Sequence, residues 1–261
     1  MSICITPSWR RGMRRWPPKR SASASCGSGP RSEVIMHDAM LDTILTGDAR
    51  ALAARIPDES VDFIFTDPVY ERIEDYAWLA ETAARILKPN RACLVWCSNR
   101  GQFAAKTAMD PHLTFVLPLS YTKVAKAHRA FGYKTFLWTT PCLWFQKGTH
   151  ADHAWLVDTV IDHSNAIIST ATPPKDSYKW HKNPEAYISW LKAFSRPGDV
   201  VYDPFTGSGS LPVECKRLGR HFLASEIDPQ VAEQARQRLA ATATIDPRFE
   251  PEQNLLFEDA A

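Results

Sequence analysis

The segment VYDPFTGSG, residues 201–209, decides the fold of this chain. A β-rich run ends in a glycine-rich turn, and a helix reaching Leu218 is expected to follow it. Glycine lets the backbone approach a ligand closely, and the first turn of a helix offers unpaired N–H groups. The segment therefore predicts a cradle for a nucleotide-type cofactor, although a bare Gly-x-Gly also occurs in ordinary strand-to-helix turns.

Two carboxylates make this cradle more specific. Asp203 stands at the tip of the strand, where it can hold a cationic amino group, and Glu226 closes the next strand, 23 residues later. A carboxylate at that second position can accept both hydroxyls of a ribose. A dehydrogenase would have a third glycine where this chain has Leu211-Pro212. The pattern favours a cofactor with a positively charged amino acid end over one with a pyrophosphate.

A second motif, Thr66-Asp67-Pro68-Val69-Tyr70, follows the β-rich run of residues 61–65. At a strand tip, Asp67 can accept one N–H of a planar amino group and the Pro68 carbonyl the other, while Tyr70 stacks on the ring. Taken alone, the motif favours a simple turn that ends a strand over a site that binds an amino group.

Strands and helices alternate around these motifs. This rhythm predicts an α/β fold with a doubly wound, mostly parallel sheet covered on both faces. Strands are expected at residues 43–45, 61–65, 92–97, 200–202 and 221–225, and helices at residues 49–55, 77–87, 99–109, 185–194, 210–218 and 229–241.

Residues 111–151 break the rhythm. They contain no Asp or Glu, five Lys/Arg and eight aromatic residues. Residues 114–121 and 136–145 can form an antiparallel pair, and residues 148–180 are expected to be irregular. The basic and aromatic side chains suit DNA phosphates and a flipped base. A second interpretation is favoured about equally: the aromatic side chains lie mostly in the hydrophobic core, and the lysines form a solvated edge.

Together the two motifs resemble the amino-group DNA methyltransferases, which form N6-methyladenine or N4-methylcytosine with S-adenosylmethionine. The resemblance extends from Leu41 to about Ala241 and includes Leu45-Thr46-Gly47-Asp48 and Glu226-Ile227-Asp228-Pro229. The catalytic motif precedes the cofactor motif, as in the β-group of the family. This order implies a circularly permuted, Rossmann-like methyltransferase fold.

The resemblance implies a role for each matching residue. Asp67, Pro68 and Tyr70 are expected to be catalytic. The expected cofactor-binding residues are Asp48, Lys182, Asp203, Phe205, Gly207, Ser208, Gly209, Glu226 and Ile227. Those expected to bind DNA, in the segment between the motifs, are Lys123, Lys126, Arg129 and Lys134.

Two positions depart from the family pattern. Val69 replaces a second proline, which costs some rigidity but leaves the groups of the neighbouring residues in place. Lys182 lies one residue earlier than the family lysine, with Asn183 before Pro184. It either contacts the cofactor or helps the chain enter the following helix.

The implied function is N6-adenine methylation of double-stranded DNA by direct in-line transfer to a flipped-out base. Adenine is preferred because an Asp at the head of the catalytic motif accompanies adenine more often in the β-group. The alternatives are an N4-cytosine enzyme, an RNA methyltransferase, or a catalytically silent DNA-binding homologue. Related β-group enzymes often dimerise, so a homodimer is also implied.

The net charge of +2 conceals a basic leader. Residues 1–35 carry seven Lys/Arg and one acid, so the remainder carries a net charge of −4. The leader is expected to be a disordered arm or an artefact of a start codon at Met36 or Met40, and it also resembles a transit peptide or a phosphate-binding arm. The expected domain is then residues 36–245, with residues 111–180 facing the substrate and residues 246–261 forming a tail.

Cysteine usage and hydropathy exclude other classes. The six cysteines show no Cys-x-x-Cys pair and no His-rich spacing, so they are expected to be buried, reduced thiols rather than metal ligands. This favours a cytoplasmic protein without a metal. No apolar run approaches the roughly 18 residues that a membrane-spanning helix needs.

Overall fold

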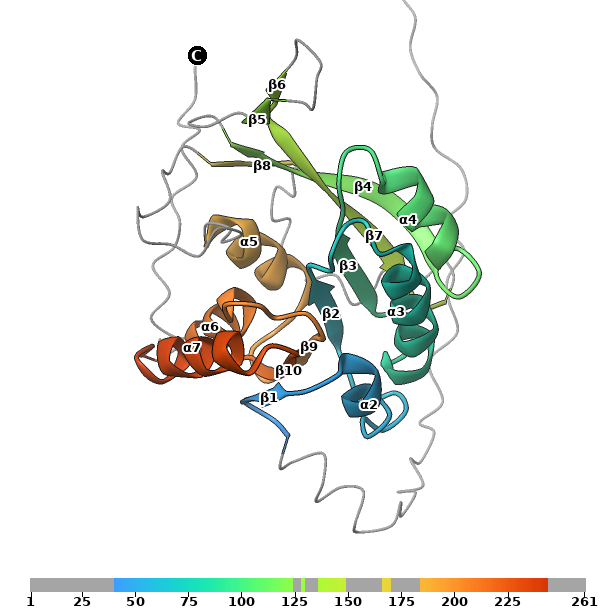
Figure 1. Cartoon of the computed structure of the whole chain (residues 1–261). Helices are drawn as coiled ribbons and strands as arrows, with labels where there is room; N and C mark the ends of the chain where they lie inside the picture. Colours follow the sequence, from blue (N-terminus) through green and yellow to red (C-terminus); the bar gives the residue numbers. More distant parts are fainter. Residues whose placement is uncertain (1–39, 124–127, 130–135, 149–165, 170–183, 244–261) are drawn as a thin grey trace, which may run out of the picture.

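The computed structural model describes residues 40–123, 128–129, 136–148, 166–169 and 184–243 (Figure 1). The leader and the tail predicted for residues 1–35 and 246–261 lie outside these ranges. The strands are β1 (Thr43–Thr46), β2 (Phe63–Thr66), β3 (Ala92–Trp96), β4 (Thr114–Lys123), β5 (His128–Arg129), β6 (Phe136–Leu137), β7 (Thr139–Gln146), β8 (Ala166–Ser169), β9 (Val200–Asp203) and β10 (His221–Glu226). The helices are α2 (Ala49–Ala53), α3 (Ile73–Ile86), α4 (Gln102–Met109), α5 (Glu185–Phe194), α6 (Ser210–Arg217) and α7 (Pro229–Ala240).

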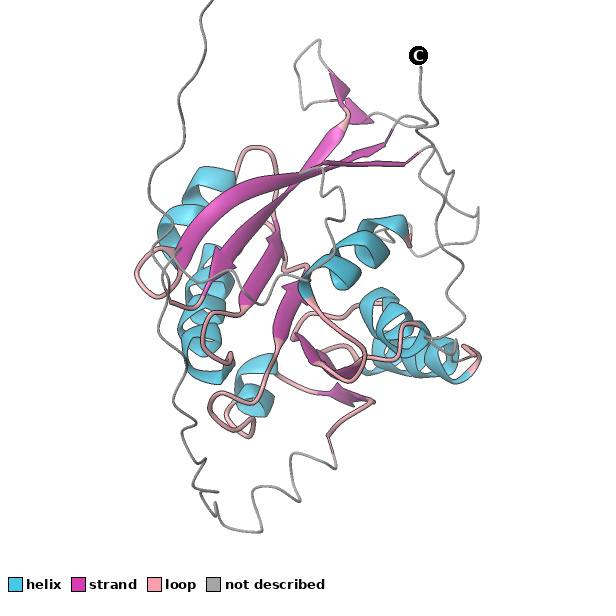
Figure 2. Ribbon diagram, turned by 180° about the vertical axis from the view of Figure 1, so that it is seen from behind, coloured by secondary structure: helices cyan, strands magenta, loops and turns pink. Residues whose placement is uncertain are grey.

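Eight of the described strands form one sheet in the order β1-β10-β9-β2-β3-β7-β4-β8. Strand β7 runs antiparallel to both of its neighbours, and every other pairing in this sheet is parallel. The predicted α/β fold with a mostly parallel sheet is confirmed, and so is the antiparallel pair, formed by β4 and β7. In Figure 2 these two long strands extend past the shorter parallel strands.

Helices cover both faces of the sheet because its central strands are apolar on both sides. Phe63 and Phe65 of β2 join the core on one face, and Ile64 joins the core on the other. Helices α2, α3 and α4 cover one face, and α5, α6 and α7 cover the other (Figure 1). Within the described ranges, no helix is long and apolar enough to cross a membrane.

Two predicted elements need correction. Helix α3 begins at Ile73, four residues before the expected start, and the acidic residues Glu74 and Asp75 in its first turn suit the positive end of the helix dipole. Residues 148–180 were expected to be irregular, yet β8 lies within them and pairs with β4. Four residues in a polar stretch give too short a pattern to distinguish a strand from a loop.

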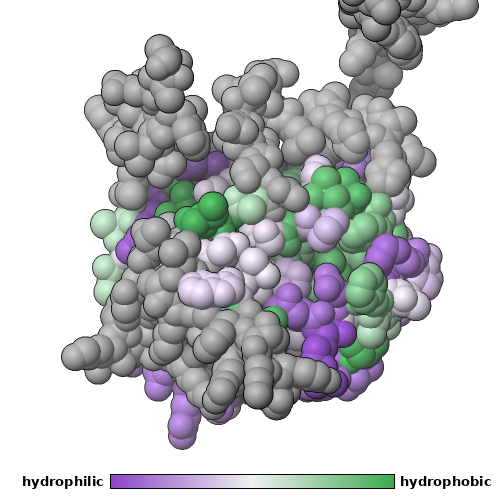
Figure 3. Space-filling model, turned by 90° about the horizontal axis from the view of Figure 1, so that it is seen from above, coloured by the Kyte–Doolittle hydropathy of each residue, from purple (hydrophilic) through white to green (hydrophobic). Residues whose placement is uncertain are grey.

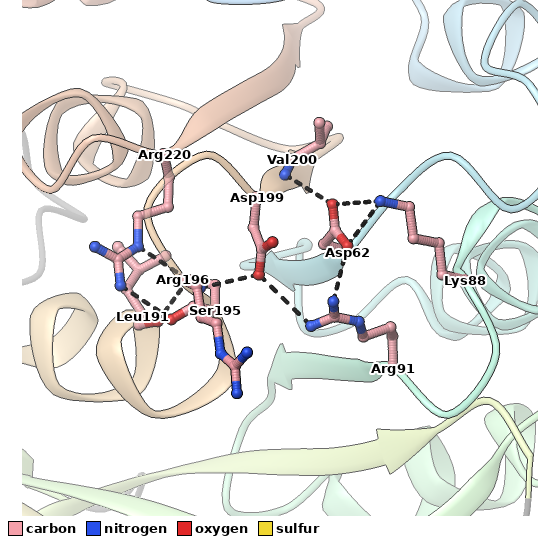
Figure 4. A network of polar contacts seen from close by, with 9 residues as sticks. All are labelled: Asp62, Lys88, Arg91, Leu191, Ser195, Arg196, Asp199, Val200 and Arg220. Carbon is pink, nitrogen blue, oxygen red and sulfur yellow. Dashed lines mark hydrogen bonds and ion pairs between the residues drawn. The ribbon is translucent and has the colours of Figure 1, made fainter. Parts of the chain in front are cut away.

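The amino-terminal edge of the sheet is tied together by the buried carboxylate of Asp62 (Figure 4). Lys88 Nζ lies 2.8 Å from both carboxylate oxygens, and Arg91 Nη2 lies 3.1 Å from Oδ1. The Val200 N–H donates to Oδ2 at 3.1 Å. Arg91 Nη1 reaches Asp199 Oδ2 at 3.5 Å. The contacts join the starts of β2, β3 and β9.

Asp62→Asn is expected to lower the free energy of unfolding by about 2–3 kcal/mol, because it leaves two cations facing a group without charge. Urea unfolding measures this loss. Lys106→Ala serves as the control, since Lys106 pairs with Asp110 on the surface and such pairs contribute about 0.5 kcal/mol. Equal losses in the two variants would contradict the structural role of Asp62.

Candidate active site

The two sequence motifs meet at the carboxyl-terminal edge of the sheet. Strands β9 and β2 are parallel neighbours, so the residues that follow them share this edge. Thr66 Oγ1 donates a hydrogen bond to Asp203 Oδ1 at 2.6 Å, which joins the two motifs directly. Strands β10 and β1 lie beside β9 in the same direction and bring Glu226 and Asp48 to the same edge.

Backbone hydrogen bonds fix the glycine-rich turn. The Thr206 N–H donates to the Ser225 carbonyl at 3.0 Å, and the Gly207 N–H donates to Glu226 Oε2 at 2.9 Å. The other Glu226 oxygen accepts from the Asp228 N–H at 3.0 Å. Each carboxylate oxygen has two lone pairs, so these bonds orient Glu226 and leave it able to accept from a ligand hydroxyl.

Gly209 occupies the tightest position of this turn. It caps α6 with φ +75°, and a Cβ placed on it would lie 3.0 Å from Ala235 Cβ and 3.3 Å from Ile44 Cδ1. Gly207 also has a positive φ, of +51°, but a Cβ there would meet nothing within 4 Å. Gly209 is thus required for packing as well as for backbone conformation, whereas the space beside Gly207 is open to a ligand.

Gly209→Ala is expected to lower the free energy of unfolding by about 2–4 kcal/mol, because the left-handed conformation and the crowding both oppose a side chain. Gly207→Ala is the matched control and is expected to cost about 1 kcal/mol, from the conformation alone. Thermal unfolding of both variants measures the difference. A larger loss at Gly207 would show that the packing around Gly209 is wrongly assigned.

Asp203 is a buried carboxylate at the centre of the edge, with only 5% of its surface exposed. Burial raises the pKa of Asp203 from 3.8 to about 7, although hydrogen bonds from Thr66 and the Phe205 N–H oppose the rise. The nearby charge of Asp67 raises this pKa further. A buried acid of this kind is stabilised in its ionised form by a cation placed beside it.

The catalytic motif forms a short turn after β2. Asp67 and Tyr70 are half-buried, Pro68 is buried and Val69 is 56% exposed. The Arg72 N–H donates to the Val69 carbonyl at 3.0 Å and closes the turn. Burial raises the pKa of Tyr70, and Asp67, which accepts a hydrogen bond from its hydroxyl, raises it further.

Several predicted cofactor residues surround this centre. Asp48 caps α2 by accepting from the Arg50 N–H at 2.7 Å. Phe205 packs edge-on against Trp78 of α3, with ring centroids 5.8 Å apart. The Ser208 carbonyl lies 3.4 Å from Arg238 Nη1. Ile227 is 70% exposed and contributes an apolar surface beside Glu226.

The space-filling view in Figure 3 shows apolar side chains exposed beside polar ones on the face seen from above. The exposed large apolar residues within the described ranges are Val69, Phe103, Trp138, Ile168 and Ile227. Two of them, Val69 and Ile227, belong to the predicted motifs. Apolar side chains in those positions can contact flat, aromatic ligands.

Sequence reasoning missed three side chains that the fold brings to the site. Thr66 was quoted at the head of the second motif but was given no role, and in the structure it holds Asp203. Tyr187 of α5 lies close enough to Asp67 and Asp203 for both charges to raise its pKa, after the larger effect of burial. Trp78 lies against Phe205. Only the position of Thr66, directly before Asp67, could have indicated its role.

Other predicted site residues are not tested by the structure. Lys126, Lys134 and Lys182 lie outside the described residues. The backbone of Lys123 ends β4 and that of Arg129 lies in β5, which pairs with β6 beyond the end of the large sheet (Figure 1). The proposed roles of these residues therefore stay predictions.

Comparison with known proteins supports the resemblance found in the sequence. Residues 120–237 match the family model of the DNA methylases of the N6/N4 type, and the matched region includes the whole cofactor motif. The predicted resemblance to the amino-group DNA methyltransferases is confirmed. Strand β2, which carries the first motif, precedes strand β9, which carries the cofactor motif, and this is the order of a circularly permuted fold.

Individual DNA methylases are similar over most of the chain. DNA adenine methyltransferase YhdJ of Escherichia coli K12 is 26% identical over 244 residues, which cover 76% of this chain and 82% of that protein. The crystal structure of M1.HpyAVI has a TM-score of 0.63 at 21% identity and covers 76% of this chain and 98% of that one. The cytosine-N4-specific PvuII methyltransferase has a TM-score of 0.63 at 14% identity and covers 75% of this chain and 85% of that one.

Proposed function

We propose that this protein transfers a methyl group from S-adenosylmethionine to the exocyclic N6 of adenine in double-stranded DNA. The observation that carries the proposal is the hydrogen bond from Thr66 to Asp203. It holds the strand that ends in Asp67 beside the strand that ends in the cofactor motif, so an amine bound at one motif faces a methyl donor bound at the other.

The residues at this edge fit S-adenosylmethionine. Asp203 is a buried acid whose ionised form needs a cation, and the amino acid end of the cofactor carries one. Glu226 is oriented by two backbone N–H groups and is able to accept from the ribose hydroxyls. Gly207 leaves open space beside the turn, and Ile227 supplies an apolar surface for the adenine ring. M1.HpyAVI has been solved as a complex with S-adenosylmethionine.

The same fit gives the other cofactor-motif residues their proposed roles. Phe205, Ser208 and Gly209 line the turn, and Asp48 lies near the cofactor adenine. Lys182 is proposed to approach the cofactor from the segment before α5. We propose Lys123, Lys126, Arg129 and Lys134 as contacts to DNA phosphates.

The chemistry of the catalytic turn concerns the lone pair of the amine. That lone pair is delocalised into the base, which makes the exocyclic nitrogen a poor nucleophile. The Asp67 carboxylate and the Pro68 carbonyl accept its two N–H groups and favour the tetrahedral, nucleophilic form. Tyr70 releases its hydrogen bond to Asp67 and packs against the ring of the flipped base.

When bound, S-adenosylmethionine supplies an electrophilic methyl group on a cationic sulfur leaving group. Such a donor, held by Asp203 and Glu226, would be attacked directly by the amine lone pair, with the sulfur leaving as a neutral thioether, so no cysteine nucleophile would be needed. This suits the described cysteines, all of which are buried. The amine then loses one proton, for which Asp67 is the nearest proposed acceptor.

The test is incubation of the protein with tritiated S-adenosylmethionine and unmethylated genomic DNA, followed by chromatography of the nucleosides. Label in N6-methyl-2′-deoxyadenosine is the expected result. Label in N4-methylcytosine would keep the mechanism and overturn the choice of base. Cofactor binding without label in any DNA would favour an RNA substrate or a silent DNA-binding homologue. The predicted homodimer is measured separately, by light scattering.

A further inference from the structure

A buried carboxylate outside both motifs, Asp75, joins two of the loops that build the site. Asp75 lies in the first turn of α3 and is 2% exposed. Its Oδ1 pairs with Arg50 Nη2 at 2.8 Å, and its Oδ2 pairs with Arg72 Nε at 3.2 Å. The two oxygens of one carboxylate are therefore divided between two arginines, one in α2 and one directly before α3.

Each arginine belongs to a different part of the proposed machinery. Arg50 lies in α2, two residues after Asp48, and its N–H donates to the Asp48 carboxylate at 2.7 Å. Arg72 follows Tyr70 by two residues, and its N–H closes the catalytic turn. Asp75 thus stands between the loop that follows β1 and the loop that follows β2.

The contacts continue to a third loop. The Arg50 guanidinium lies over the ring of Trp78, with its carbon 5.2 Å from the ring centroid. Trp78 meets Phe205 edge-on, with the ring planes at 72°. The series Arg72, Asp75, Arg50, Trp78 and Phe205 therefore links the segments after β2, β1 and β9.

Asp75 is more deeply buried than either of the arginines with which it pairs. The side chains of Arg50 and Arg72 are 39% and 52% exposed, so each retains contact with water. An exposed arginine adopts many rotamers unless a partner restrains it, and two of them share this buried carboxylate. Removing the charge of Asp75 would take this ion pair from Arg50 and would leave Arg72 with only its 3.4 Å contact to the exposed Glu74.

We propose that Asp75 is a positioning residue that sets the cofactor-binding loop after β1 against the catalytic loop after β2. This inference rests on the proposed function. Asp75 touches neither the cofactor nor the base and acts through Arg50 on cofactor binding and through Arg72 on methyl transfer. Both steps therefore depend on one carboxylate.

The experiment compares Asp75→Asn with Asp62→Asn. Both carboxylates are 2% exposed and both pair with two cations, but Asp62 lies at the opposite edge of the sheet. Calorimetry with S-adenosylmethionine gives the Kd, and single-turnover methylation at saturating cofactor gives the transfer rate. Asp75→Asn is expected to raise the Kd about tenfold and lower the rate about tenfold. Asp62→Asn is expected to leave both within about twofold while unfolding at lower urea concentration.

Two further variants separate the effect on cofactor binding from the effect on methyl transfer. They also provide the test if Asp75→Asn does not fold. Arg50→Ala is expected to raise the Kd about fivefold with a smaller effect on the rate at saturating cofactor. Arg72→Ala is expected to lower that rate about fivefold and leave the Kd unchanged. Adding either change to Asp75→Asn should have little further effect on the same quantity, because the shared partner is already lost.

A variant Asp75→Asn that keeps the Kd and the rate of the wild type overturns the inference. Asp75 would then contribute only to stability, as Asp62 does. Equal effects of Arg50→Ala and Arg72→Ala on the Kd also overturn it. The effect of Asp75 on the Kd for S-adenosylmethionine is measured by binding alone. This half of the inference is therefore tested even if the wild type methylates no DNA. A wild-type protein that binds no S-adenosylmethionine overturns the proposed function itself, and the positioning role with it.

Discussion

Asp67→Ala is expected to abolish methylation while the protein still binds S-adenosylmethionine. The variant removes the acceptor that favours the nucleophilic form of the amine, an interaction made most strongly in the transition state, so the transfer rate should fall by about 10³-fold or more. The cofactor lies against β9 and β10 in the proposed arrangement, so its Kd should stay within about threefold. Single-turnover methylation and calorimetry measure the two quantities.

A secondary effect of Asp67→Ala distinguishes this arrangement from others. The charge of Asp67 helps to raise the pKa of Asp203. Its removal should lower that pKa and slightly strengthen cofactor binding near pH 6.5. Asp67→Asn is the matched control, because it keeps an acceptor oxygen and should retain more activity than the alanine variant. A methylation rate within tenfold of the wild type would show that another group holds the amine.

Asp203→Asn is expected to weaken cofactor binding and to stabilise the folded protein above pH 7. Loss of a charge-assisted contact to the amino group should raise the Kd for S-adenosylmethionine by about 10–100-fold. In the wild type, burial raises the pKa of Asp203 from 3.8 to about 7, so between these pH values the folded state holds a proton that the unfolded state has released. The stability that this proton contributes is fully present below pH 4 and is lost as the pH rises to about 7.

The asparagine variant has no such loss. At pH 8 its free energy of unfolding should exceed that of the wild type by roughly 2–4 kcal/mol, and the difference should vanish at pH 4. Urea unfolding at the two pH values measures this. The wild type should also release a proton on binding cofactor at pH 6.5, which calorimetry in buffers of different ionisation enthalpy detects. A variant that is less stable than the wild type at pH 8 would contradict the buried, ionised state of Asp203.

The meeting of Asp67 and Asp203 was predictable from sequence because it follows from a general rule. Parallel strands end at one edge of a sheet, so carboxylates at their tips converge wherever the strands are neighbours. The order of the two motifs resembles that of the β-group, and this resemblance implied which strands are neighbours in the sheet. The alternation of strands and helices along the chain likewise predicted a sheet with two covered faces.

The link through Asp75 was not predictable, because it depends on how helices are placed rather than on what strands contain. Arg50 and Trp78 lay in predicted helices and outside any motif, and Asp75 lay before the predicted start of its helix. Their contacts arise from the angle at which these helices meet above the sheet edge, and no local pattern encodes that angle. Strand β8 was missed for a different reason, since its pairing with β4 comes from distant residues and not from its own four-residue sequence.

The strand order has a consequence for synthesis of the protein. Strands β10 and β9 lie between β1 and β2, although the ribosome makes them after every other described strand of the sheet. In a nascent chain that has reached β8, β1 has not yet met its partner β10, and β2 has not yet met β9. The sheet is completed only when the last quarter of the chain emerges and inserts between β1 and β2. Completion of the sheet therefore depends on contacts between the two ends of the chain, which slows folding and leaves two strand edges open to chaperones until the last strands are made.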